Sequence, residues 1–166
     1  MNRIIRWVGA AVLGCAFVAV ARADTPVPLD KVPDAVKKAV STRFPGAEMV
    51  KASKEMEEGK ELYEVAIKTN GQRLDVTATP DGTLTGIEKV IDAKDLPRAV
   101  TDALNEKYPR ADLKKVEEVI KVADGKETLD VYEVLLVTAD NKKYEVSFLP
   151  NGTVKEVEDK NKPKKD

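Results

Sequence analysis

The chain has 166 residues, with 28 basic and 29 acidic side chains, one Cys and no His. This near balance of charge excludes the strongly basic surface by which proteins usually hold nucleic acids. Because His is the most common general base and metal ligand, its absence also excludes enzymes and zinc sites that depend on imidazole.

Residues 1–23 have the pattern of an export signal. Arg residues flank the start of an apolar run over residues 7–20, which is too short for a stable membrane span. Ala21-Arg22-Ala23 then offers small side chains at the positions that signal peptidase reads. We expect cleavage after Ala23 and a periplasmic or secreted protein without a membrane segment. The alternative is a lipoprotein anchored through Cys15, because the residues before it loosely resemble a lipobox.

Removal of this leader would change both the cysteine content and the charge. It holds the only Cys and three of the 28 basic residues, so the remaining chain would have no disulfide and 25 basic residues against 29 acidic ones. This mildly acidic balance gives no electrostatic reason to expect nucleic acid or an anionic membrane as a partner. About 143 residues suffice for one or two small hydrophobic cores. The oligomeric state is left open.

A segment of about 65–70 residues occurs twice, which indicates a duplicated structural unit. We expect one unit over residues 24–91, a second over 92–158, and a charged, disordered tail over 159–166. The matched blocks are Val32-Pro33-Asp34-Ala35-Val36 with Leu96-Pro97-Arg98-Ala99-Val100, Leu62-Tyr63-Glu64-Val65 with Val131-Tyr132-Glu133-Val134, and Pro80-Asp81-Gly82-Thr83-Leu84 with Pro150-Asn151-Gly152-Thr153-Val154.

Each unit should open with a helix. Apolar residues recur at helical spacing from Leu29 to Phe44 and from Leu96 to Tyr108, and a Pro directly follows each of these aromatic residues. Asp95 is the expected N-cap of the second helix. The spacing predicts two helices of about three to four turns, each with one apolar stripe.

The rest of each unit alternates apolar and polar residues with the period of a β-strand. Turn sequences such as Asn70-Gly71 separate the strands, and turns this short join antiparallel neighbours. We expect an α+β fold of two tandem α-β-β-β-β units, each a helix on a four-stranded antiparallel sheet, with the two sheets abutting or merged into one curved sheet of eight strands. The expected strands are residues 48–56, 62–68, 73–79 and 84–90, and residues 112–122, 129–138, 143–149 and 153–158.

No group of residues predicts catalysis. Glu64 and Glu133 occupy equivalent places in the two units, as do Asp75 and Glu145, and such pairs could act as acid and base, as they do in glycosidases. Strand alternation places them on the solvated face of an open sheet, so we interpret them as members of cross-strand ion pairs. We therefore expect no enzyme activity, no catalytic residue and no cofactor. The expected cations of these pairs are Lys68, Arg73 and Lys143.

Three further carboxylates lie near the turn at Asp124-Gly125. Asp124, Glu127 and Asp130 could hold Ca²⁺, which prefers carboxylate oxygens. Their spacing matches no calcium-binding loop, so we interpret them as part of a solvated turn and expect no metal site.

Alternation divides the strand side chains between two faces of the sheet. One set should face the helices and form the core. The other face carries apolar residues among Thr, Ser and charged ones, and we hypothesise that it contacts a protein partner. The expected core residues are Tyr63, Val65, Ile67, Tyr132, Val134 and Leu136. The expected partner contacts are Leu62, Glu64, Ala66, Asp75, Thr77, Leu135, Val137, Glu145 and Ser147.

The order of these motifs resembles the PepSY-like domains, also described as beta-lactamase-inhibitor-like. The resemblance rests on Leu/Val-Pro-x-Ala-Val, Phe/Tyr-Pro-x-Ala, Tyr-Glu-Val and Pro-Asp/Asn-Gly-Thr, and it covers nearly all of residues 29–158 as two copies. It implies an exported bacterial protein without catalytic residues. The wider group is associated with restraint of peptidases, and the inhibitors use a concave sheet of two tandem helix-and-sheet units. Their disulfides are absent here, which argues against a beta-lactamase as the target.

Together these features favour a non-enzymatic binding or inhibitory module that acts through its sheet face, on a peptidase or another envelope enzyme. The alternative is a sensor that holds a small ligand or a metal in the cleft between the units. A pocket with converging polar groups would favour the sensor, and a desolvated carboxylate pair would favour a cryptic enzyme.

Mass spectrometry of the protein isolated from the cell envelope checks the leader. The intact mass should correspond to residues 24–166, because signal peptidase cuts after small side chains such as Ala23. A diacylglyceryl group on Cys15 would show a lipoprotein instead.

Overall fold

The computed structural model describes residues 25–57 and 59–161. Within them it shows two helices and one antiparallel sheet, which confirms the predicted α+β class. The expected leader, residues 1–23, lies outside the described part, and so does Cys15. The helices are α1 (Asp34–Arg43) and α2 (Arg98–Lys107), and the strands are β1 (Thr25–Val27), β2 (Glu48–Glu57), β3 (Lys60–Thr69), β4 (Gln72–Ala78), β5 (Leu84–Val90), β6 (Asp112–Ala123), β7 (Lys126–Val137), β8 (Lys143–Phe148) and β9 (Val154–Asp159).

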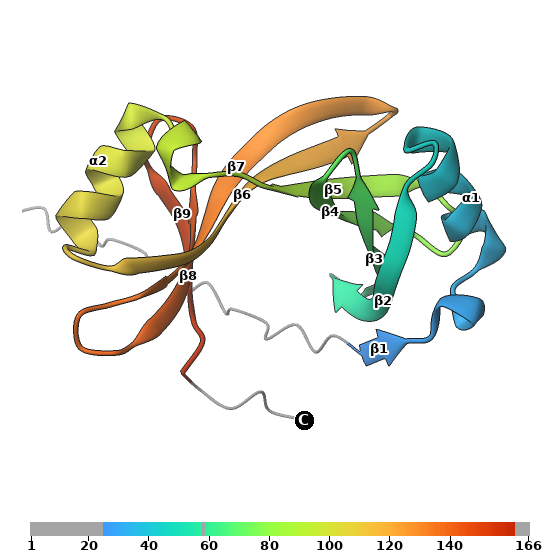
Figure 1. Ribbon diagram of the computed structural model, residues 1–166, viewed down its shortest axis with the longest axis horizontal. Coiled ribbons are helices and arrows are strands. Elements are labelled where there is room, and N and C mark those ends of the chain that lie inside the picture. The colour runs from blue at the N-terminus through green and yellow to red at the C-terminus, as the bar shows by residue number, and fades with distance from the viewer. Residues whose placement is uncertain (1–24, 58, 162–166) are drawn as a thin grey trace, which may run out of the picture.

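The nine strands form one sheet in which each strand pairs with the next along the chain, so β1 and β9 are its edges (Figure 1). The two units join where β5 pairs with β6, with Glu88 opposite Val119. The merged form of the sheet is therefore the one that occurs. The expected number of eight strands is wrong, because β1 adds to β2 with Val27 opposite Ala52. Pro26 is tolerated there because an edge strand leaves one row of backbone groups unpaired.

Both helices begin directly after a proline. The chain before them forms 3-10 turns at Leu29–Lys31 and Ala93–Asp95, and then becomes extended at Val32 and Leu96. A residue that precedes Pro is pushed out of the helical conformation, so the helices begin later than predicted. Asp95 consequently lies in the 3-10 turn and is not the N-cap. No helix in the described part is long and apolar enough to cross a membrane.

The core lies between the helices and the sheet, as one apolar cluster in each unit. Val36 and Val40 of α1 pack against β3 and β4, and Val100 and Leu104 of α2 pack against β7 and β8. In Figure 1 the two helices lie at opposite ends of the molecule. The predicted phase of β3 and β7 is confirmed, since the residues expected to face the helices belong to these clusters. Those with no exposed surface are Val65, Ile67, Val134 and Leu136.

One glycine in each unit fixes how closely the helix approaches the sheet. Gly82 and Gly152 lie in the matched turns after β4 and β8, with φ of +87° and +84°. A Cβ atom at Gly82 would lie 2.6 Å from the backbone oxygen of Ala35, and one at Gly152 would lie 2.3 Å from that of Ala99. Both distances are well inside van der Waals contact, so only glycine fits. This contact explains why the Gly-Thr turn and the Pro-x-Ala helix start recur together.

The ordered chain continues beyond the predicted end of the second unit. Asp159 is the last residue of β9. Asn161 accepts a hydrogen bond from the backbone nitrogen of Lys143 at 2.9 Å and donates one to its oxygen at 3.0 Å. These bonds offset the entropy of ordering the segment. Residues 159–161 thus take part in the end of β9 and its hydrogen bonds, whereas the charged tail was expected to begin at Asp159, and residues 162–166 lie outside the described part.

The contact between the turn and the helix can be tested by replacing a glycine that makes it, Gly82, and a glycine that does not, Gly71, by Asn. Gly71 has a φ of +75°, but no atom lies within 4 Å of the position that a Cβ would take there, and Asn tolerates this left-handed conformation. Gly71→Asn should therefore lower the free energy of unfolding by less than about 1 kcal/mol. Gly82→Asn should lower it by about 2 kcal/mol or more, because the Cβ overlaps the α1 backbone. Equal losses in urea denaturation would contradict the contact.

Candidate functional site

The candidate site is the face of the sheet that points away from the helices, which we call the inner face. Ala66 of β3 lies opposite Asp75 of β4, and Leu135 of β7 lies opposite Glu145 of β8. By strand alternation, all of the predicted partner contacts lie on this face. Its residues are Leu62, Glu64, Ala66, Asp75, Thr77, Glu88, Lys115, Glu117, Glu133, Leu135, Val137, Glu145 and Ser147.

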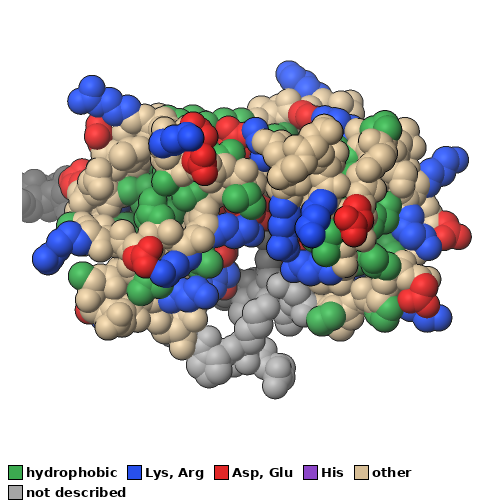
Figure 2. All heavy atoms as spheres, in the orientation of Figure 1, with side chains coloured by type: hydrophobic (Ala, Val, Ile, Leu, Met, Phe, Trp, Pro, Cys, Tyr) green, Lys and Arg blue, Asp and Glu red, His purple; other side chains and the backbone are tan. Residues whose placement is uncertain are grey.

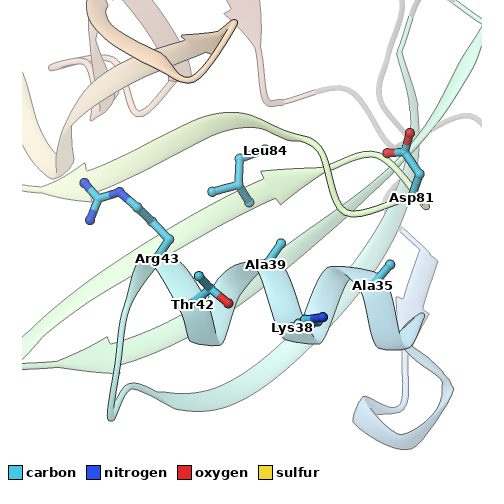
Figure 3. Close-up of a pocket in the computed structure, with 7 residues that line it drawn as sticks. All are labelled: Ala35, Lys38, Ala39, Thr42, Arg43, Asp81 and Leu84. Carbon is cyan, nitrogen blue, oxygen red and sulfur yellow. The ribbon is translucent and has the colours of Figure 1, made fainter.

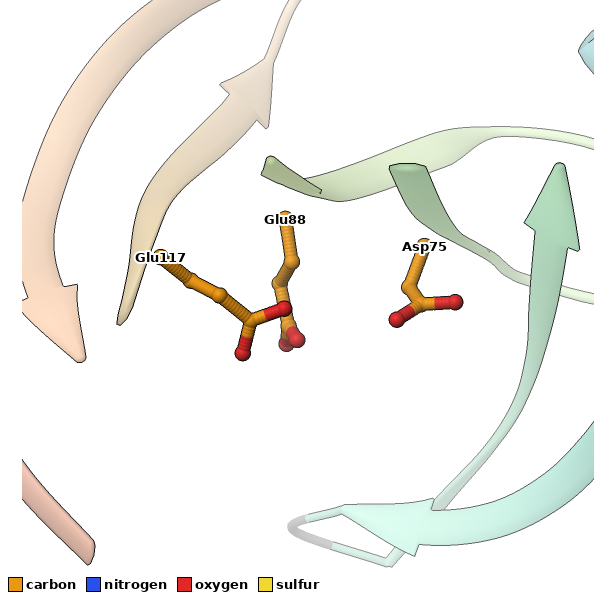
Figure 4. Close-up of side chains that lie close together, drawn as sticks. All are labelled: Asp75, Glu88 and Glu117. Atoms are coloured by element: carbon orange, nitrogen blue, oxygen red, sulfur yellow. The ribbon is translucent and has the colours of Figure 1, made fainter. Parts of the chain in front are cut away.

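Much of the inner face is buried, against expectation. Leu62, Ala66, Asp75 and Thr77 are between 1% and 8% exposed, so the description of a solvated open face is wrong for the first unit. Neither α1 nor α2 packs on this face. Instead, the continuous sheet is strongly twisted and curls around the centre of the face (Figures 1 and 4). The predicted contacts that remain partly exposed are Glu64, Leu135, Val137, Glu145 and Ser147.

Three carboxylates meet at the centre of the inner face. Asp75 of β4, Glu88 of β5 and Glu117 of β6 each offer one oxygen atom, and these atoms all lie within 4.8 Å of one another. Figure 4 shows the three side chains extending into the space that the curved sheet surrounds. Asp75 and Glu117 are buried and Glu88 is half-buried. We call this group the acidic cluster. It depends on both units, because β6 belongs to the second.

Lys115 of β6 is the cation that lies closest to the acidic cluster. Its Nζ atom is 2.7 Å from Glu117 Oε1 and 3.9 Å from Asp75 Oδ2. Burial by itself would lower the pKa of Lys115, but the bond to Glu117 and the charges of Asp75 and Glu88 outweigh burial and raise it. The pKa of Glu117 is raised by burial, and Lys115 opposes that shift.

Two glutamates of the inner face have pKa values far above the usual range of a carboxyl. Burial raises the pKa of Glu88 to about 7, and the charge of Glu117 adds to the shift. Burial raises the pKa of Glu133 to about 8, together with the charge of Glu145 and a hydrogen bond to it. Both groups therefore exchange protons near neutral pH, which isolated surface carboxylates do not.

The predicted cross-strand ion pairs are present only in part. Arg73 Nη2 approaches Asp75 Oδ1 no closer than 3.9 Å. Glu145 Oε1 is 2.9 Å from Nζ of Lys160, which was not among the expected cations. Lys160 follows β9, in the segment that was expected to be disordered. The inner face therefore holds its charges by contacts that strand alternation alone does not identify.

Glu88, Glu117 and Lys115 are functional candidates that the sequence analysis does not single out. Their neighbours Ile87 and Val116 are buried, so alternation would place Glu88 and Glu117 on the inner face. The sequence leaves open whether the two sheets merge, and it predicts no register between β5 and β6. Without that pairing, these glutamates belong to separate sheets.

The three carboxylates near Asp124 do not converge. Glu127 Oε1 is 2.8 Å from Arg43 Nε, and Asp130 Oδ2 is 2.8 Å from Lys155 Nζ. Asp124 is exposed at the hairpin tip. These three residues therefore belong to a solvated turn with surface ion pairs. The Arg43–Glu127 pair also ties the β6–β7 hairpin to the end of α1, so it links the two units a second time.

The surface has hollows outside the inner face as well. A depression of about 620 Å³ lies beside α1 (Figure 3). Two of its charged groups are engaged elsewhere, because Asp81 Oδ1 accepts a 3.0 Å bond from the backbone of Thr83 and Arg43 is paired with Glu127. Lys38 and Thr42 are its other polar side chains. Figure 2 shows a further hollow between the two halves of the molecule, with Lys and Arg side chains beside it. The residues that line the first depression are Ala35, Lys38, Ala39, Thr42, Arg43, Asp81 and Leu84.

The raised pKa values predict how stability depends on pH. The folded protein keeps protons on Glu88 (pKa about 7) and Glu133 (pKa about 8) that the unfolded chain loses near its ordinary value of 4.5. Folding therefore takes up protons, and stability falls as the pH rises from about 5 through 8. Glu133→Gln should flatten this dependence and raise the thermal midpoint at pH 8.5. Glu106→Gln, an exposed position on α2, should keep the original slope. An unchanged slope in Glu133→Gln would contradict the assignment.

Solved structures share this fold. A protein from Bacteroides eggerthii described as one of several "putative periplasmic proteins" matches with a TM-score of 0.63 and 19% identity over 77% of this chain and 88% of its own. A DUF2874 family protein from Bacteroides uniformis matches with a TM-score of 0.61 and 18% identity, over 76% and 88%. A BLIP-like protein from Bacteroides fragilis matches with a TM-score of 0.59 and 18% identity, over 82% and 90%. At these identities the likeness concerns the fold.

Comparison with curated proteins finds no match. The pattern of one protein family, described as "Putative beta-lactamase-inhibitor-like, PepSY-like", matches residues 17–86 and again residues 85–126. The two segments follow one another along the chain, in agreement with a repeated unit. Together they cover more than half of the sequence. The chain thus belongs to the PepSY-like, beta-lactamase-inhibitor-like family.

Proposed function

We propose that this chain is an exported, non-enzymatic module that binds a protein partner through the inner face of its sheet. One observation carries the proposal. A single sheet built from both units curls around a face that neither α1 nor α2 covers, and this face displays half-buried apolar side chains next to carboxylates. Apolar anchors with polar groups around them are typical of protein interfaces.

The burial of the inner face narrows the contact surface. Asp75, Thr77 and their buried neighbours on β3 cannot reach a partner without unfolding, so we assign them to support of the face. Leu135 and Val137 of β7 and Ser147 of β8 are partly exposed and lie close together in the second unit. A specific interface needs roughly 800 Å² on each side, with a few central residues that supply most of the energy. The β7–β8 region would supply that centre, and the first unit would supply the rim.

The comparisons support this proposal in two ways. The family description refers to inhibitors, and the protein from Bacteroides fragilis with the same fold is described as BLIP-like. The protein from Bacteroides eggerthii is described by the words "putative periplasmic proteins", which agrees with the leader that we predict for residues 1–23. A peptidase or another enzyme of the cell envelope is the partner class that these resemblances favour.

A cryptic enzyme is the rival function, because burial and the neighbouring Glu145 raise the pKa of Glu133 to about 8. A carboxyl with a pKa near neutral suits a general acid. Catalysis also needs a pocket in which a substrate meets the acid, and the depressions beside α1 and α2 do not include these residues. We therefore favour binding over catalysis.

Photocrosslinking in the cell envelope tests the proposed function. A photoreactive amino acid at Val137 or Ser147 should capture the same partner, because both side chains belong to the proposed contact surface. The same amino acid at Glu106, on the exposed side of α2, should not capture it. Mass spectrometry then identifies the partner.

Binding of the identified partner to purified variants completes this test. Leu135→Arg should weaken binding by about tenfold or more, as expected for a central interface residue. Its thermal midpoint should stay near that of the wild type, because Leu135 is partly exposed. Capture from α2 only, or full binding by Leu135→Arg, would contradict the assignment of the inner face.

A further inference from the structure

The acidic cluster contains a buried oxygen atom without a hydrogen bond. Asp75 is 5% exposed, yet its Oδ1 atom has no hydrogen-bond partner. The Arg73 guanidinium is 3.9 Å away, which is too far for a hydrogen bond. A buried carboxylate oxygen without a donor is strongly unfavourable unless a proton or a cation compensates it. Arg73 and Lys115 reach the two oxygen atoms of Asp75 only at 3.9 Å, so this buried carboxylate has distant cations but no direct donor at Oδ1.

The distances within the acidic cluster fit one bound ion. Oxygen atoms that bind the same Ca²⁺ at about 2.4 Å can lie at most about 4.8 Å apart. One oxygen from each of Asp75, Glu88 and Glu117 satisfies this limit. Asp75 and Glu88 stand directly opposite each other on β4 and β5, and Glu117 faces Val90 across the next pair of strands. The backbone of the sheet therefore holds the three ligands in position before any ion arrives.

The charges around the acidic cluster also favour a cation. Glu64 of β3, Glu133 of β7 and Glu145 of β8 lie on the same face, and their charges act on the pKa values of the cluster or of one another. Lys115 lies among the carboxylates, and Lys160 is held at the edge by Glu145. Carboxylates thus outnumber ammonium groups where water is partly excluded. A divalent cation would compensate part of this negative charge.

The ammonium group of Lys115 is a cation that the acidic cluster holds only weakly. It bonds to Glu117 at 2.7 Å, but the Lys115 side chain is 39% exposed. A Lys side chain on a flexible stem can turn outward to water when another cation takes over its carboxylates. Lys115 would then act as a tethered competitor that weakens, but does not prevent, the binding of an ion.

We propose that Asp75, Glu88 and Glu117 form a binding site for one Ca²⁺ ion at the centre of the inner face. Ligands that are all carboxylate oxygens select hard cations over Zn²⁺. Ca²⁺ accepts irregular sets of oxygens completed by water, whereas Mg²⁺ demands near-ideal octahedral geometry. The sequence predicts no metal site, because these ligands come from three strands and form no short motif. The inference does not depend on a protein partner.

Calorimetric titration of the metal-free protein with Ca²⁺ tests the site. We expect one Ca²⁺ per chain at pH 7.5 and a rise in the thermal midpoint when Ca²⁺ is present. Asp75→Asn and Glu117→Gln should each weaken binding by about tenfold or more, since even outer contacts of a metal site cost that much. Lys115→Gln should tighten binding, because it removes the competing ammonium. A merely structural Lys115 would not produce this gain.

Asp124→Asn is the matched control, since it removes the same charge from the exposed hairpin tip. Its affinity for Ca²⁺ should equal that of the wild type. In the metal-free state, Asp75→Asn should keep or raise the thermal midpoint while losing the Ca²⁺-dependent rise, which separates loss of the site from loss of the fold.

Acidity gives an independent readout of the same site. Affinity should fall as the solution is acidified, because carboxylate ligands must be deprotonated to bind the ion. The inference is overturned if about 10 mM Ca²⁺ gives neither heat nor a shift of the thermal midpoint at pH 7.5. Loss of binding in Asp124→Asn, or equal or tighter binding of Mg²⁺, would also overturn it.

Discussion

The pairing of β5 with β6 is the constraint on which the rest of this structure depends. It converts two helix-and-sheet units into one sheet and sets Glu88 beside a strand of the second unit. The same pairing brings Glu117 toward Asp75, so the acidic cluster exists only because the units are joined. In two separate sheets, Glu117 would have no reason to lie beside Asp75 and Glu88. The backbone hydrogen bonds between β5 and β6 thus hold several carboxylates close together where water is partly excluded. Lys115 and bound protons reduce the repulsion between these carboxylates.

The two duplicated units differ in how much of their inner face is exposed. On the inner face of the first unit, Ala66 and Asp75 are buried, whereas Leu135 and Glu145 at related places in the second unit remain partly exposed. The first unit therefore acts mainly as a support, and the second presents the accessible side chains. The long β6–β7 hairpin reinforces the difference, because it reaches back to Arg43 at the end of α1. A duplication need not produce two equivalent binding surfaces.

Sequence periodicity predicted those parts of the structure that depend on local geometry. The phase of β3 and β7 followed from the alternation around Val65 and Val134, and the helices followed from their apolar stripes and flanking prolines. Burial of Asp75 and Thr77 could not be predicted in this way. Alternation assigns a side chain to a face, but the curvature of the whole sheet decides whether water reaches that face. The register between β5 and β6 is likewise a tertiary property, so the meeting of Glu88 with Glu117 has no local signal.

The ends of the sheet also bear on how the molecule behaves at high concentration. An open sheet can grow by adding strands from other copies, which leads to fibrils and precipitation. At one end, β1 is three residues long and Pro26 at its centre has no N–H to donate. At the other end, β9 presents exposed charged residues, among them Lys155 and Glu156. Neither edge strand offers a long, uncharged row of backbone groups to a strand from another copy. The inner face can therefore remain uncovered without the sheet polymerising through its edges.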